Sequence, residues 1–259
     1  MAQYIEVEDA IGMSGLRVVL SPGVPGPWSE AAKGILHVKK IPYVKVRQEL
    51  GGPNLALQRW SAQTTAPVFA YNDERPRSIW SDQLYLVERL EPNPPLIPAN
   101  LKDRALMFGL ANEICGETGL GWARRLMLLH PALSDPNAPE AAKKASTYMG
   151  NKYGYNRAGA EAAPARTAEI LTALAAQLAN QHTGGSRFLI GFQLSALDIY
   201  WATFAALIDP LPDNLCPMPA TYRRMYHCED PIIRAALAPQ LLVHRDFIYH
   251  EYLELPVDL

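Results

Sequence analysis

The chain has 259 residues, about half of them hydrophobic and 19% charged, with a formal net charge of −2. This composition excludes a largely disordered chain and a membrane-spanning protein, and the lack of excess Lys and Arg argues against nucleic acid as a partner. The three cysteines, Cys115, Cys216 and Cys228, form no C-x-x-C pair, which favours a reducing compartment. Because its first residues are acidic rather than basic and apolar, the sequence predicts a cytoplasmic protein.

The first part of the chain alternates between strand and helix patterns. Residues 16–20 and 43–47 are short and rich in β-branched residues, and both predict strands. Between them, apolar residues recur at three- and four-residue spacing after Pro27, which predicts an amphipathic helix. This part therefore begins with a strand, a helix and a second strand.

A second group of elements follows. Residues 66–71 predict a third strand that starts with a proline, and residues 77–80 predict a short fourth strand. The apolar residues of the next segment predict a helix that ends near Leu90, with Ser81 or Asp82 as its N-cap. The order of the first part is thus β-α-β followed by β-β-α.

Prolines at 92, 94, 95 and 98 interrupt any regular structure and predict a stiff linker over residues 92–100. The linker divides the chain into one domain at residues 14–91 and another at 101–259. The second contains helical patterns and no convincing strand. Helices are expected at 101–129 with a break near 119–121, and then at 140–150, 164–181 and 199–207, with a loop at 131–139. The aromatic tail from Pro239 is expected to pack back across a domain, where it would be able to close a cleft.

This order of elements resembles the cytosolic glutathione S-transferase superfamily, of which the chain looks like an atypical member. In the second domain, Gly191, Ser195 and Asp198 are similar to the superfamily's buried helix-capping motif, in which the serine and the aspartate satisfy free amides at a helix start. The resemblance covers most of residues 15–230. It implies an α/β thioredoxin-like domain followed by an all-α helical bundle, with glutathione as the cofactor.

Site residues for glutathione follow from the resemblance. Ala66, before a cis-Pro67, would exchange backbone hydrogen bonds with the cysteinyl part of glutathione. Ser81 and Asp82 would hold the γ-glutamyl end, although Trp80 stands where the family has an acid. A plain helix-capping role for Ser81 or Asp82 is the alternative.

At the position that activates the glutathione thiol in the family, this chain has a different residue. Where its serine- and cysteine-type members carry a hydroxyl or thiol, this chain has Gly26, followed by Pro27 and Trp28. Ser29 is the nearest candidate for a catalytic hydroxyl, and the alternative is an ordinary surface residue of the first turn. With proline at the first helical position, the amides of residues 28–30 are expected to lack intrahelical partners and to form an anion site that lowers a thiol pKa.

The remaining expectations concern substrate and assembly. Trp122, Arg125, Tyr148 and Tyr153 are the substrate-binding candidates for a small hydrophobic electrophile, and simple packing is the alternative for each. The six histidines show no metal-binding spacing, so no metal site is expected. The resemblance also implies a homodimer. Three functions fit: a glutathione S-transferase in detoxification, a catalytically silent binding or regulatory protein of the same fold, or a glutathione-dependent lyase, isomerase or ether-cleaving enzyme.

Overall fold

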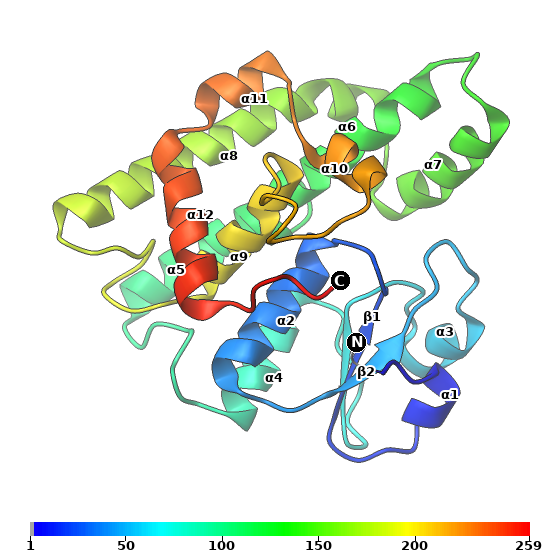
Figure 1. Cartoon of the computed structure of the whole chain (residues 1–259), viewed down its shortest axis with the longest axis horizontal. Coiled ribbons are helices and arrows are strands. Elements are labelled where there is room, and N and C mark those ends of the chain that lie inside the picture. The colour runs from blue at the N-terminus through cyan, green and yellow to red at the C-terminus, as the bar shows by residue number, and fades with distance from the viewer. Residues whose placement is uncertain (1–2) are drawn as a thin grey trace.

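The computed structural model describes residues 3–259, and Figure 1 shows an α/β part below a larger helical part. The sheet of the α/β part has the order β2-β1-β3, with β2 parallel and β3 antiparallel to the central strand. In chain order its elements are α1 (Val7–Ala10), β1 (Leu16–Leu20), α2 (Pro27–Lys39), β2 (Val44–Arg47), α3 (Leu55–Ser61), β3 (Val68–Tyr71) and α4 (Trp80–Leu90).

Side chains of the central strand β1 alternate between two buried layers. Leu16, Val18 and Leu20 join the main core with residues of α2 and α4. Val19 faces a smaller cluster in which α1 and α3 cover the other side of the sheet through Val7, Ala10 and Leu57. The sheet is therefore covered by helices on both faces, as a thioredoxin-like domain requires.

Two sequence predictions in this part are wrong. Residues 77–80 form no fourth strand, since Arg77 makes only an isolated bridge to Phe69 before α4 begins at Trp80. Ser81 and Asp82 do not cap α4, whose N-cap is Ile79 without a side-chain hydrogen bond. The α/β part also begins before residue 14, because Ile5 pairs with Val46 of β2.

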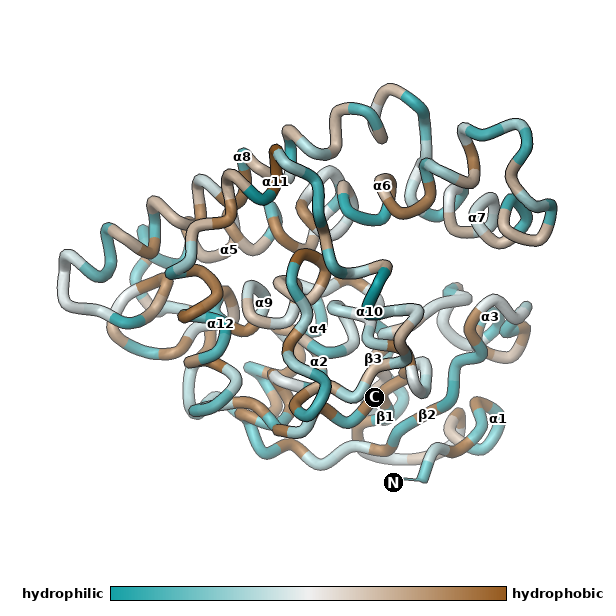
Figure 2. Tube along the Cα trace, turned by 45° about the horizontal axis from the view of Figure 1, so that its top comes forward, coloured by the Kyte–Doolittle hydropathy of each residue, from teal (hydrophilic) through white to brown (hydrophobic). Residues whose placement is uncertain are grey.

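The helical part confirms the predicted all-α bundle. It contains α5 (Leu101–Cys115), α6 (Leu120–Ser134), α7 (Glu140–Lys152), α8 (Arg157–Thr183), α9 (Ala196–Phe204), α10 (Ala220–Tyr226), α11 (Pro231–Ala236) and α12 (Pro239–Tyr252). The expected break lies at residues 116–119, α6 runs through Pro131, and α8 begins at residue 157 rather than 164. Figure 2 shows hydrophobic and hydrophilic segments alternating along α8, as expected for a helix with one buried face.

The centre of the bundle is α9, in which every residue is buried. It packs against α2 of the α/β part and against α5 and α12. The predicted capping box at its start is present. This fully buried helix therefore fixes the position of α2, whose N-terminus faces the candidate site.

The tail packs back as expected, but it does not close a cleft. In Figure 1 the segment after α12 runs in front of α2. There the Val257 amide donates to the Leu215 carbonyl at 2.8 Å, and Asp258 accepts from Lys33 and Lys45. The three cysteines are free and buried. Within residues 3–259, no helix is both long and apolar enough to cross a membrane.

Candidate active site

Helix α2 begins without a side-chain cap. Its N-cap is Gly26, in extended geometry, and Pro27 occupies the first helical position. Among residues 3–259, the amides of Trp28 and Ser29 have no hydrogen-bond acceptor, whereas the Glu30 amide donates to the Gly26 carbonyl at 2.9 Å. The helix therefore presents two free amides instead of the expected three.

These amides face a cavity that we call the small cavity. It encloses about 550 Å³, counting its open mouth. The strand ends, α2 and α6–α7 all contribute to its wall, which is formed by Ser21, Val24, Gly26, Trp28, Ser29, Gln48, Leu50, Gly51, Thr65, Ala66, Arg125, Tyr148, Met149, Lys152 and Tyr153. Six of the predicted site residues, Trp28, Ser29, Ala66, Arg125, Tyr148 and Tyr153, thus meet in one place.

A second and larger cavity adjoins the first. This large cavity encloses about 1640 Å³, again counting its open mouth, and lies between the loop after β1, α6, α7 and α10. Leu128, Leu129, Met149, Met225 and Tyr222 give it largely apolar walls. Arg125 and Tyr148 line both cavities, so the two cavities meet at these side chains.

Arg125 is held at this junction by aromatic side chains. Its Nη2 donates to the Tyr226 hydroxyl at 3.1 Å, and its guanidinium carbon lies 5.4 Å from the Tyr226 ring centroid and 5.9 Å from that of Trp28. Burial raises the pKa of Tyr153 beside it, and the charge of Arg125 partly opposes that shift. Tyr153 therefore stays protonated at neutral pH.

Lys152 supplies a second positive charge, which the sequence analysis did not single out. Its Nζ donates to Thr65 Oγ1 at 2.8 Å, across the small cavity. Burial of the ammonium group, together with the nearby charge of Arg125, lowers the pKa of Lys152 to about 8. At neutral pH most molecules therefore carry both charges beside the free amides of α2.

The other predicted residues lie outside the two cavities. Ser81 and Asp82 are in the first turn of α4, and Pro67 lines a separate interior cavity below α2 and α4. The Ala66–Pro67 bond is cis, as the resemblance implies. Trp122 packs behind Tyr153, with ring centroids 4.7 Å apart, and its Nε1 donates to the Tyr153 carbonyl at 3.1 Å.

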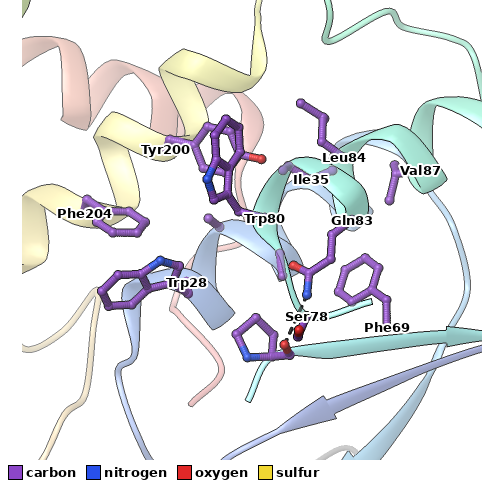
Figure 3. Close-up of a pocket in the computed structure, with 13 residues that line it drawn as sticks. Trp28, Ile35, Phe69, Ser78, Trp80, Gln83, Leu84, Val87, Tyr200 and Phe204 are labelled. Atoms are coloured by element: carbon purple, nitrogen blue, oxygen red, sulfur yellow. Dashed lines mark hydrogen bonds between the residues drawn. The ribbon is translucent and has the colours of Figure 1, made fainter. Parts of the chain in front are cut away.

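Trp80, at the family's acid position, turns toward the helical part. Figure 3 shows it against Tyr200, and the two ring centroids are 5.3 Å apart. In the same view Gln83 reaches back toward the strand, where its Nε2 donates to the carbonyls of Pro67 and Arg77, each at 3.1 Å. Gln83 was not predicted, and its only signal in the sequence is a polar residue on the inner face of an otherwise apolar helix.

Within residues 3–259, no group of three or more His, Cys, Asp or Glu side chains is arranged to hold a metal ion. The cavities instead offer an anion site made of amides and cations, next to apolar walls. Such an arrangement suits the ionisation of a thiol and its attack on an apolar partner.

Comparisons with solved structures give similarity over nearly the whole chain. A glutathione S-transferase domain-containing protein from Marinobacter aquaeolei is 16% identical, with a TM-score of 0.63, over 91% of this chain and 98% of its own. A rice enzyme crystallised with glutathione is 18% identical, with a TM-score of 0.59, over 94% of this chain and 93% of its own. A glutathione S-transferase from Methylobacterium radiotolerans, in complex with glutathione sulfonate, is 16% identical, with a TM-score of 0.59, over 92% of each chain.

The sequence matches no protein-family model and no curated protein. The likeness therefore rests on the backbone: a thioredoxin-like sheet with its helices, followed by a helical bundle that packs on α2. Together with the solved structures, this arrangement shows that the chain has the glutathione S-transferase fold.

Proposed function

We propose that the protein is a glutathione S-transferase-like enzyme that joins the glutathione sulfur to a small hydrophobic electrophile. The observation that supports this most is the junction of the two cavities. The small cavity carries free amides and positive charges, the large one has apolar walls, and Arg125 lies between them. A polar nucleophile and an apolar partner would therefore meet at one point.

Glutathione, when bound, would supply the sulfur nucleophile, and the free amides and cations of the small cavity suit its negative charge. The amides of Trp28 and Ser29, with Arg125 and Lys152, would favour the thiolate over the thiol. Ser29 Oγ would donate to the sulfur, and the Ala66 backbone would bind the cysteinyl part. In this proposal the first turn of α4, with Ser81 and Asp82, faces the γ-glutamyl end.

A calorimetric titration with reduced glutathione at neutral pH tests binding first. We expect saturable one-site binding at micromolar to low millimolar affinity. The same preparation is then assayed with an activated aryl chloride, with glutathione alone as the uncatalysed reference. Absence of binding at several temperatures contradicts the proposal.

A second candidate is a binding or regulatory protein without transferase activity. Gly26 provides no hydroxyl or thiol, and Trp80 replaces the family's acid with an aromatic ring packed on Tyr200. Saturable glutathione binding without acceleration of any electrophile would favour this candidate over the enzyme.

The variant Ser29→Ala tests the proposed hydroxyl. A hydrogen bond to an ionised partner contributes about 1.5–3 kcal/mol, so we expect the pKa of the bound thiol to rise by about one to two units. The pKa is measured from thiolate absorbance as a function of pH, and thermal unfolding serves as the control for folding. An unchanged pKa would exclude Ser29 from the mechanism.

The variant Gly26→Ser would place a hydroxyl where the resemblance expects one. A Cβ built at this position meets only Ser29 Oγ, at 3.9 Å, and the Gly26 backbone is extended, so serine fits without strain. We expect a lower thiol pKa and a faster reaction, by about tenfold for one added hydrogen bond of roughly 1.4 kcal/mol. Gly26→Ala is the matched control, because it adds the Cβ alone, and an equal gain in that variant would contradict the expectation.

We also propose a homodimer formed through α4 and α5. These helices touch through their side chains, with the Tyr85 and Phe108 rings stacked 5.3 Å apart. The surface around them exposes the large apolar side chains of Ile79, Tyr85, Leu101 and Leu106. Size-exclusion chromatography with light scattering should give twice the chain mass, and Tyr85→Glu should shift it to the monomer mass. A wild-type monomer would contradict this assembly.

A further inference from the structure

All charged side chains that line the two cavities are positive. Arg125, Lys144 and Lys152 contribute to their walls, and no Asp or Glu of residues 3–259 lines either cavity. The whole chain has 26 acidic residues against 24 Lys and Arg, so its composition does not explain this absence. The cavities therefore form a positive region in a slightly negative protein.

Arg125 has no counter-charge within the part of the chain that the structure describes. Its Nη2 donates to the Tyr226 hydroxyl at 3.1 Å, a second neutral phenol, that of Tyr153, lies beside it, and its Nε is buried without any acceptor. Arg166, elsewhere in the bundle, instead pairs with both Glu113 and Glu169. A partly buried guanidinium stays charged, and leaving one of its N–H groups unsatisfied is unfavourable. A ligand anion would remove that cost.

Two cations of the region differ in which cavity they reach. Lys152 lines the small cavity and is bonded to Thr65 there. Lys144 lines only the large cavity, on the same helix as Tyr148, and forms no ion pair among the described residues. The large cavity therefore has a positive group at its junction with the small cavity and another on α7.

The rest of the large cavity is apolar, with Leu128, Leu129, Met149 and Met225 in its walls. A neutral apolar molecule would fill this space but leave Lys144 without an ion-pair partner and the buried Nε of Arg125 without an acceptor. A molecule with an apolar body and one anionic end would satisfy both features.

We propose that the electrophile is a hydrophobic organic acid, whose carboxylate or equivalent anionic group is bound by Lys144 and Arg125 in the large cavity. This inference rests on the proposed glutathione-dependent function. In the reaction with a chloroaryl acid, a carbon–sulfur bond forms, the carbon–chlorine bond breaks, chloride leaves, and the thiol proton passes to solvent.

The test compares two electrophiles of nearly equal shape, 4-chloro-3-nitrobenzoate and 4-chloro-3-nitrobenzamide. For each, kcat/KM is divided by the uncatalysed rate constant with glutathione, which removes the difference in intrinsic reactivity. We expect this normalised value to be about tenfold higher for the acid, as one charge-assisted contact allows, and to decrease with salt. Equal values for the two compounds would overturn the inference while leaving the transferase proposal intact.

Helix α7 offers a matched pair of variants. Lys143, next to Lys144, lines neither cavity and donates to the Pro136 carbonyl at 2.6 Å. We expect Lys144→Gln to reduce the preference for the acid several-fold and Lys143→Gln to leave it unchanged. Equal effects of the two variants would overturn the assignment of Lys144. If Arg125→Met weakens glutathione binding but leaves the preference intact, the assignment of Arg125 to the acid is overturned.

A binding measurement separates this inference from the proposed function. Quenching of tryptophan fluorescence is followed with 3-nitrobenzoate and 3-nitrobenzamide, which lack the leaving group, in the absence of glutathione. Tighter binding of the acid, lost in Lys144→Gln, supports the anion site even if no electrophile is turned over. Equal binding of the two compounds contradicts the site.

Discussion

Replacing Asp198 with alanine should lower the free energy of unfolding by about 3–5 kcal/mol, as expected when one partner of a buried charged network is removed. The side chain is fully buried at the start of α9. Its carboxylate accepts from the Leu189 amide at 2.8 Å, from the Ser195 amide at 2.8 Å and from Ser195 Oγ at 2.7 Å. It also accepts from His244 Nε2 of α12 at 3.0 Å. Alanine would leave these donors buried without an acceptor.

Urea unfolding followed by circular dichroism measures this loss. Ser195→Ala is the matched control, because it removes one hydroxyl from the same network and leaves the carboxylate in place. We expect it to cost about 1 kcal/mol. Similar stabilities for the two variants would contradict the central role of the carboxylate in joining α9, the loop before it and α12.

Elements with a clear hydrophobic pattern could be predicted, because that pattern is visible in the sequence itself. The strand at residues 16–20 and the helix after Pro27 were found at their observed positions. The short helices α1 and α3 were not found. Four or seven residues contain too little periodicity, and such helices are stabilised by tertiary contacts, here those of Val7 and Leu57 beneath the sheet. At residues 77–80 the β propensity of the segment was overridden, because Trp80 begins α4 and packs on Tyr200.

The candidate site could be predicted where the resemblance places residues on known elements. Trp28, Ser29 and Ala66 lie together because the start of α2 and the segment that leads into β3 meet at the same edge of the sheet. Lys152 could not be predicted, since a lysine near the end of a helix is ordinarily a surface residue. Only the fold brings it to Thr65 and Arg125, where its pKa falls. The sequence also does not show that Trp122 lies behind Tyr153 rather than in the wall of the small or the large cavity.

The variant Trp28→Ala should lose both stability and glutathione binding. The Trp28 ring is 4.8 Å from that of Phe204 in α9, between centroids, and its Nε1 donates to the Cys115 carbonyl at 3.0 Å. A Cβ built on Gly121 of α6 would be 2.8 Å from the indole, so α6 is also packed tightly against it. Truncating a fully buried tryptophan costs about 3–5 kcal/mol, and we expect a loss near the lower end for the partly buried Trp28. Because Trp28 also lines the small cavity, we expect glutathione binding to weaken at least about tenfold.

Trp122→Ala provides the matched control for this prediction. Trp122 belongs to the same aromatic cluster, with its ring centroid 6.2 Å from that of Trp28, but it lines neither of the two cavities. Its removal should therefore reduce stability in urea unfolding while changing the calorimetric dissociation constant for glutathione much less than Trp28→Ala does. If both variants weaken glutathione binding equally, the effect comes from loosening of the cluster, and Trp28 has no separate role in the wall of the small cavity. If only Trp28→Ala weakens binding, the indole that joins α2 to the helical bundle also forms part of the binding site.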